Sequence, residues 1–323
     1  MTPYFEQDGV TLYHGDCREI LPQLGQQFQT VLTDPPYGKV RGDFDQAWTN
    51  RRAMLADVTQ WRDAIVDRMT ANATLWWFAW PSLAGLIEAH IAERLNPLAH
   101  VVWKKPASLA QKHCPEILRA PGPETERILM FEQYGADSWA LGETGYAHKC
   151  DEARGMVFEP LRAYLAGEWD RAGLTSKDAN EATQTQMAGH WFSAVQWALP
   201  TEVNYSKLQE RANRNGGNFL RREYEDLRRY FSLKTGQPKT DIWEFPPATT
   251  DERLGHPTPK PLALIRFMID ISVRPQTAIL DPFAGSGTTL LAARLEGRQA
   301  VGIEISERYC EIAANRLRQK LLF

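Results

Sequence analysis

The chain has 323 residues, with 37 Lys and Arg against 40 Asp and Glu, and a formal net charge of −3. Because 43% of the residues are hydrophobic and 24% are charged, the composition is that of a folded globular protein and excludes a disordered chain. The near-neutral charge excludes a uniformly basic nucleic-acid binder, and no apolar run approaches the ~20 residues of a membrane span.

Short apolar runs alternate with helical patterns in the first third of the chain. The runs are rich in Val, Ile, Leu and aromatic residues and end in turn residues, as buried parallel strands do. They cover Val10–His14, Thr30–Thr33, Thr74–Trp80, His100–Trp103 and Arg127–Phe131. Between them, apolar residues recur at three- and four-residue steps from Met54 to Met69 and from Leu83 to Leu95, which predicts amphipathic helices.

The middle of the chain lacks this rhythm. It predicts three short helices at Glu159–Trp169, Ser176–Thr183 and Gln186–Trp197, with a turn near Gln184. We interpret residues 132–247 as an insertion, mainly helical, between two halves of one α/β domain at 1–131 and 248–323.

The C-terminal part returns to alternating elements. Its pattern predicts helices at Pro261–Ser272, Thr288–Glu296 and Glu307–Leu322, and strands at Thr277–Leu280 and Ala300–Ile305. Both ends of the chain therefore indicate βαβ units of one parallel sheet, and the fold class is α/β.

A Gly-rich turn lies between a predicted strand and a predicted helix at residues 278–289. Glycines at 285 and 287 allow the backbone to approach a ligand closely, and Glu304 ends the next strand, 23 positions after Asp281. Position 290 is Leu, so the dinucleotide pattern GxGxxG is incomplete, and an adenosyl ligand without phosphates fits better. The alternative is an ordinary strand–helix turn.

The strand at Thr30–Thr33 is followed by Asp34, Pro35, Pro36 and Tyr37. Prolines have no N–H and fix φ, so the strand stops and its last carbonyls can face a ligand at the edge of the sheet. Asp34 and the Pro35 carbonyl can accept the two N–H bonds of an exocyclic amine, while Tyr37 can stack on the ring that carries it. The alternative is a strand terminator with a surface tyrosine.

Together, DPPYG at 34–38 and DPFAGSGTT at 281–289 resemble the S-adenosylmethionine-dependent amino-DNA methyltransferases of the permuted β subgroup. Two other segments are similar: LYHGDCREIL at 12–21 and HPTPKP at 256–261, where Pro259 replaces the Gln of many relatives. The resemblance covers roughly 10–131 and 256–318. It implies a seven-stranded, mostly parallel Rossmann-like sheet with an inserted target-recognition region.

The resemblance also implies site residues. The catalytic set is Asp34, Pro35, Pro36 and Tyr37. The residues implied to bind S-adenosylmethionine are Asp16, Cys17, Asp34, His256, Lys260, Pro261, Asp281, Pro282, Phe283, Ala284, Gly285, Ser286, Gly287, Thr288 and Glu304.

Cysteine usage argues against a metal site. The four cysteines are far apart and form no CxxC, and pairs such as His113 with Cys114 lack a second pair at zinc spacing. We expect no metal and no disulfide. With no signal peptide visible at the N-terminus, we expect a cytoplasmic protein, associated with the nucleoid of a prokaryotic cell.

Charge is concentrated locally. Residues 203–239 carry nine Lys and Arg against four acids, a net of +5. We predict contacts with duplex DNA from Lys104, Lys105, Lys207, Arg211, Arg214, Arg221 and Arg222. A solvated helical face is the alternative for the basic run. For the three central helices, the alternatives are a helix-turn-helix and a small bundle with an aromatic core.

The resemblance implies methyl transfer to adenine N6 of a base flipped out of duplex DNA, since Asp rather than Ser precedes Pro-Pro-Tyr and in that family Ser favours cytosine N4. Methylation of cytosine N4, or of RNA or a protein amide, remains open. A different class, a DNA-binding regulator with an inactive methyltransferase fold, is a further alternative. The resemblance also implies a homodimer.

Overall fold

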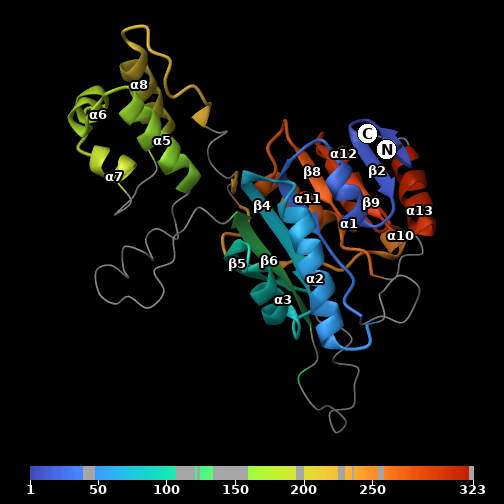
Figure 1. The fold of residues 1–323 in the computed structure, drawn as a ribbon. Coiled ribbons are helices and arrows are strands. Elements are labelled where there is room, and N and C mark those ends of the chain that lie inside the picture. The colour runs from blue at the N-terminus through green and yellow to red at the C-terminus, as the bar shows by residue number, and fades with distance from the viewer. Residues whose placement is uncertain are drawn as a thin grey trace. The chain divides into compact units, whose positions relative to one another are not determined.

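The computed structural model describes residues 1–38, 48–106, 121, 124–133, 159–193, 200–224, 230–234, 236–253 and 258–319. The chain divides into two compact units (Figure 1). One combines Met1–Gln133 with Tyr230–Phe323, and the other is Tyr134–Arg229. In the described residues, no helix is long and apolar enough to cross a membrane.

The first unit is built on one sheet with the strand order β1-β2-β9-β8-β3-β4-β6-β5-β7. The strands are β1 (Phe5–Gln7), β2 (Val10–His14), β3 (Phe28–Thr33), β4 (Met69–Ala79), β5 (Leu95–Lys104), β6 (Thr125–Gln133), β7 (Ile242–Glu244), β8 (Ala278–Asp281) and β9 (Gln299–Glu304). The described residues thus give nine strands where seven were predicted. Two of the nine, β1 and β7, are three-residue strands at the edges, too short to stand out as apolar runs.

The sheet is parallel from β2 through β9, β8 and β3 to β4. Strand β6 lies antiparallel to both β4 and β5, although its sequence was interpreted as one more parallel strand. The reason is that an apolar run indicates that a strand is buried but not whether it runs parallel or antiparallel to its neighbours. A buried antiparallel strand therefore has the same composition as a parallel one.

Helices cover both faces of this sheet (Figure 1). Alternate strand residues point to opposite faces, so Leu32, Trp76 and Phe78 join one core while Val31, Leu75 and Trp77 join the other. The first core is closed by α11 (Leu262–Ser272), α12 (Thr288–Leu295) and α13 (Glu307–Arg318). The second is closed by α1 (Cys17–Ile20), α2 (Arg51–Val66) and α3 (Ala84–Ile91). A short helix, α10, spans Thr250–Arg253, and a 3₁₀ turn spans Leu21–Gln23.

The second unit is helical where it is described. It contains α5 (Glu159–Arg171), α6 (Ser176–Thr183), α7 (Ala188–Phe192) and α8 (Glu202–Asn213). Helix α6 begins with a capping box between Thr175 and Asp178 and ends at Gln184, which adopts the left-handed conformation at the predicted turn. Its core includes Trp191 with Phe192 packed against it, as the small-bundle interpretation expected, and also Trp169. The other two expected core residues, Val195 and Trp197, lie outside the described part.

Leu165 should anchor this helical core. Its side chain is fully buried on α5, one turn from Leu161 and Trp169. Replacing Leu165 by Ala removes that packing and should lower the free energy of unfolding of this unit by about 2–5 kcal/mol. Urea unfolding followed by circular dichroism measures the loss. The exposed Asp170 on the same helix supplies the control, since Asp170→Ala should change stability by less than about 0.5 kcal/mol; equal losses would contradict the assigned core.

Candidate functional site at the carboxyl edge of the sheet

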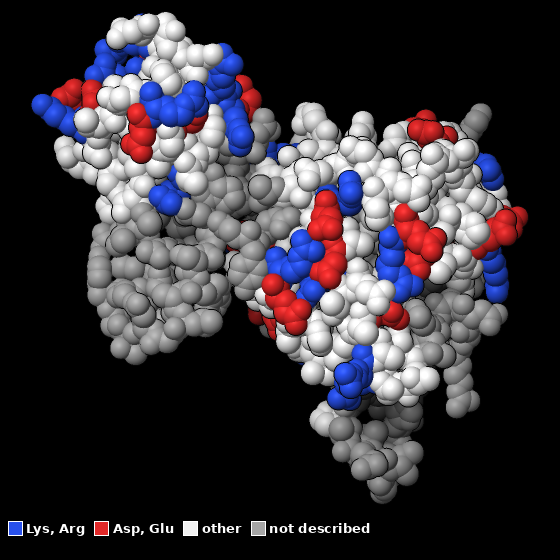
Figure 2. Space-filling view, viewed as in Figure 1, with Lys and Arg blue, Asp and Glu red and all other residues white. Residues whose placement is uncertain are grey.

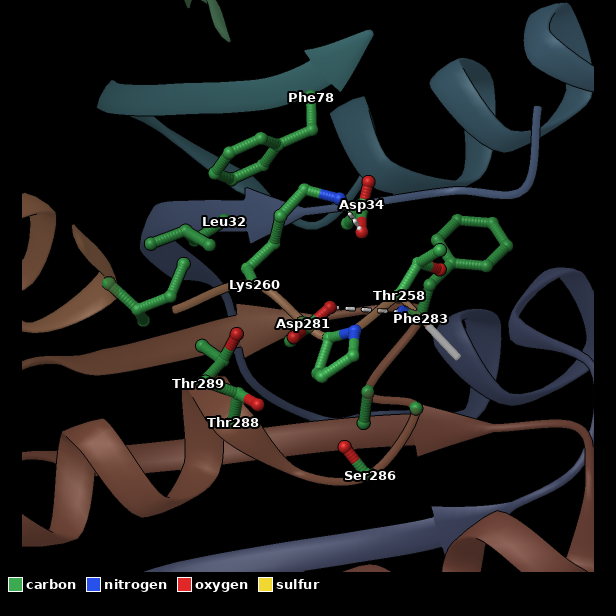
Figure 3. A pocket seen from close by; sticks show the side chains of 14 residues that line it. Leu32, Asp34, Phe78, Thr258, Lys260, Asp281, Phe283, Ser286, Thr288 and Thr289 are labelled. Atoms are coloured by element: carbon green, nitrogen blue, oxygen red, sulfur yellow. Dashed lines mark hydrogen bonds and ion pairs between the residues drawn. The ribbon is translucent and has the colours of Figure 1, made fainter. Parts of the chain in front are cut away.

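The pairing of β3 with β8 brings two carboxylates from distant parts of the sequence to one edge. Thr30 and Val31 lie beside Ile279 and Leu280 in parallel register, so both strands end on the same side. Asp34 follows the end of β3, and Asp281 is the last residue of β8. Both line a pocket, together with Phe78, Lys260, Phe283 and Ser286 (Figure 3).

The Gly-rich turn after β8 forms one wall of this pocket. Gly285 has φ +51° and Gly287 has φ +77°, a region that glycine adopts without strain. A Cβ on Gly287, which caps α12, would lie 2.9 Å from the Cβ of Ala313. Gly302 on β9 is equally confined, because its Cβ would lie 2.8 Å from Leu290 Cδ1; sequence reasoning missed this position.

Glu304 stabilises the Gly-rich turn through hydrogen bonds to its backbone. Its carboxylate accepts hydrogen bonds from the backbone N–H of Gly285 and of Ser306, both at 2.8 Å. Burial raises the pKa of Glu304 despite these bonds. Glu304 is not among the residues lining the pocket. The predicted contact of Glu304 with the cofactor hydroxyls stays a prediction.

Asp281 is buried beneath the turn, with 4% of its surface exposed. It accepts a hydrogen bond of 3.1 Å from the N–H of Phe283. Burial raises the pKa of its carboxyl group to about 7, which outweighs the opposing hydrogen bonds from Thr289 and Phe283. Near neutral pH this carboxyl is therefore poised between its neutral and charged forms.

Both oxygens of Asp34 have partners. The Tyr37 hydroxyl donates to Oδ1 and the Lys260 ammonium donates to Oδ2 (Figure 3 labels Asp34 and Lys260). Burial raises the pKa of Asp34, against the opposing effect of Lys260, and nearby Glu126 adds to the increase. Lys260 also lies 3.5 Å from Glu126 Oε2 on β6. Sequence reasoning did not identify Glu126, because nothing local distinguishes it from other strand-end glutamates.

The other predicted cofactor residues lie at or near this edge. Pro282 and Ala284 belong to the turn, Thr288 begins α12, and Pro261 caps α11. Asp16 and the buried Cys17 follow β2 but are not among the residues lining the pocket. Asp16 caps α1 and pairs with Arg18. The hydrogen bonds from Arg18 lower the pKa of Asp16. His256 lies outside the described residues.

The residues predicted to contact DNA fall into two groups. Three have acidic partners: Lys104 with Glu244 at 2.6 Å, Lys105 with Glu126 at 2.5 Å, and Arg211 with Asp178 at 2.5 Å. Arg222 lies over the ring of Tyr164 at 4.9 Å. Arg214 and Arg221 are exposed and Lys207 is half-buried. Figure 2 shows basic side chains on the surface of the second unit, with acidic ones between them.

No group of three or more His, Cys, Asp or Glu side chains in the described residues has the arrangement of a metal site. The two buried cysteines that the structure describes, Cys17 and Cys310, are free thiols. Burial raises the pKa of each to about 12. These thiols are therefore poor nucleophiles near neutral pH.

The fold defines a Rossmann-like α/β protein with a pocket at the carboxyl ends of its strands. The model of the DNA methylase family, whose name covers both N6 and N4 transfer, matches residues 28–315. The chain therefore belongs to the DNA methylase family.

Individual relatives agree with this assignment. Type II methyltransferase M.ScaI of Streptomyces caespitosus is 26% identical over 323 residues, which is 98% of this chain and 83% of its own. The structure of the M1.HpyAVI–SAM complex matches with a TM-score of 0.53 at 17% identity, over 96% of this chain and 100% of that one. PvuII DNA methyltransferase (cytosine-N4-specific) matches with a TM-score of 0.56 at 12% identity, over 99% and 90%. At these identities, the two structures show the fold alone.

The pKa of Asp281 predicts how stability depends on pH. Its folded-state pKa of about 7 lies above the ordinary value of 3.8, so the folded protein holds a proton that the unfolded chain releases. The stabilisation is complete below pH 4 and is lost as the pH rises through 7. Relative to Asp281→Asn, the free energy of unfolding of the wild type should fall by up to about 1.4 kcal/mol per pH unit in that window. Urea unfolding of both proteins at pH 5 and 7 measures this difference. If the free energy of unfolding changed equally in both proteins, the raised pKa of Asp281 would be contradicted.

Proposed function

We propose that the chain is an S-adenosylmethionine-dependent DNA methyltransferase that acts on the N6 amine of an adenine flipped out of duplex DNA. The observation that carries the proposal is the position of Asp34. Its carboxylate lines the pocket next to the Gly-rich turn, at the end of a strand that stops at two prolines. An amine acceptor and a ligand cradle thus share one cavity.

The pocket suits a cationic adenosyl ligand. Asp34 and Asp281 line it, and carboxylates in a shielded pocket attract a positive group more strongly than they would in water. Gly285 and Gly287 let the turn adopt the left-handed conformation, and Gly285 lines the pocket. Asp281, Phe283, Ser286 and Thr288 would hold the ligand here. When bound, S-adenosylmethionine supplies the electrophilic methyl group.

The residues after β3 suit an aromatic amine. Such an amine is a poor nucleophile because its lone pair is delocalised into the ring. N–H bonds accepted by Asp34 and by the Pro35 carbonyl would draw the nitrogen toward sp³ geometry and hold it in line with the methyl group, which is the main contribution of such a site. Asp34 need not be a strong base, since the amine loses its proton after it has become cationic. The ring of Tyr37 would replace part of the stacking that the base loses.

Adenine is the proposed base because Asp34 precedes Pro-Pro-Tyr, where a serine favours cytosine N4 in the family that the motifs resemble. Both bases carry an exocyclic amine beside a ring nitrogen, so the pocket chemistry alone fits either. The second unit, inserted between the two parts of the first, is proposed to read the DNA sequence. Its exposed Arg214 and Arg221 suit phosphate contacts. The resemblance to the permuted subgroup also supports a homodimer.

Substitution of Asp34 by Ala should lower methyl transfer far more than cofactor binding, because the amine acceptor is lost while the turn and Asp281 are untouched. We expect at least about a hundredfold loss of turnover, the typical effect of removing a group that stabilises the transition state. Unmethylated DNA incubated with each protein and S-adenosylmethionine is digested to nucleosides and analysed by mass spectrometry. The wild type should produce N6-methyladenine.

Each other outcome has a distinct meaning. N4-methylcytosine without N6-methyladenine would contradict the choice of adenine but support the site. Transfer to RNA or protein alone would contradict the DNA substrate. No transfer by a wild type that binds DNA tightly would favour a DNA-binding regulator.

A further inference from the structure

The ammonium of Lys260 lies between two carboxylates in the first unit. It donates to Asp34 and lies 3.5 Å from Glu126 Oε2, which is longer than a normal charge-assisted bond. Lys260 and Glu126 are each 8% exposed. The faces of Phe78 and Tyr37 complete the surroundings of the ammonium, with ring centroids 5.0 and 5.6 Å from Nζ. The charge is thus enclosed by two acids and two aromatic rings.

This arrangement conflicts with the proposed chemistry of Asp34. Tyr37 and Lys260 occupy one carboxylate oxygen each, so an incoming amine meets an acceptor that already has donors. The amine also gains positive charge as it is methylated. An ammonium held on Asp34 would repel that charge and weaken the interaction that favours the reaction. Methyl transfer would therefore be favoured if the ammonium left Asp34 first.

Glu126 is placed to receive it. Its Oε2 is buried and accepts no hydrogen bond from the described residues. Its Oε1 accepts from Lys105 at 2.5 Å, and Lys105 in turn lies over the ring of Trp103 at 4.7 Å, which fixes the carboxylate. A movement of the ammonium by less than about 1 Å would turn the 3.5 Å separation into a normal hydrogen bond. Burial opposes ionisation of Glu126, but Lys260 and Lys105 together lower its pKa, so it stays charged.

We propose that Glu126 is a positioning residue of the methyl-transfer site, which takes the Lys260 ammonium when the target amine takes its place on Asp34. The inference rests on the proposed function. The Lys260 ammonium then has two positions. It lies on Asp34 when no target base is bound, and on Glu126 when the target base is bound. Lys105 keeps Glu126 in position in both.

The test is a double-mutant cycle on duplex DNA with Glu126→Gln, Lys260→Met and the combined variant. In Glu126→Gln the ammonium loses its second carboxylate, so kcat/KM for DNA should fall by about tenfold or more, the usual effect of losing a hydrogen bond to a charged group. Binding of S-adenosylmethionine, measured by calorimetry, should not change. With Lys260 already replaced, Glu126→Gln should cost less than about twofold, because the two residues act as a unit.

The control is Glu132→Gln on the same strand. Glu132 is also buried and accepts from Asn96 at 3.1 Å, a bond that an amide oxygen can keep. Its kcat/KM should match that of the wild type. An equal loss from Glu126→Gln in both backgrounds, or a Glu126→Gln variant as active as the wild type, would overturn the inference.

Two further outcomes keep the test decisive. If Lys260→Met does not fold, the Glu126→Asp variant provides the test. It keeps a carboxylate and should recover most of the activity lost in Glu126→Gln. A Glu126→Asp variant as slow as Glu126→Gln would overturn the inference. A wild type that transfers no methyl group to DNA would overturn the proposed function, and this inference with it. Methyl transfer by the wild type with additive effects would overturn the inference alone.

Discussion

The parallel pairing of β3 with β8 is the constraint on which the site depends. These strands come from opposite ends of the chain, yet their register places Asp34 and Asp281 at the same edge of the sheet. Apolar residues on both faces of the sheet fix that register, because a slip of one residue would turn Val31 and Leu32 toward the wrong cores. The pocket is thus a consequence of how the two parts of the chain share one core.

Electrostatics then defines what the pocket can do. Asp34, Glu126 and Asp281 are carboxyl groups removed largely from water, with Lys260 as the cation between the first two. Burying unpaired charge is costly, so such a cluster is arranged for a ligand or a reaction more readily than for stability. A cationic methyl donor and an amine that becomes cationic both suit a site with this excess of negative charge.

Much of this arrangement could be predicted from local sequence. The strand that precedes Asp34 and the turn from Asp281 to Thr288 have the composition and spacing that their roles require. The direction of β6 could not be predicted, because the apolar composition of a strand reflects its burial and is the same for parallel and antiparallel strands. Lys105 pairs with Glu126, 21 positions away, and Glu126 meets Lys260 only through the fold. Partners of this kind leave no periodic signal in one sequence.

In the proposed reaction, the pocket at the ends of β3 and β8 presents a methyl donor to an amine held by Asp34. A crystal structure with an unreactive analogue of S-adenosylmethionine tests it most directly. We expect the analogue to lie against the Gly-rich turn with its reactive end facing the Asp34 carboxylate. An analogue bound elsewhere, or with its reactive end directed away from Asp34, would contradict it.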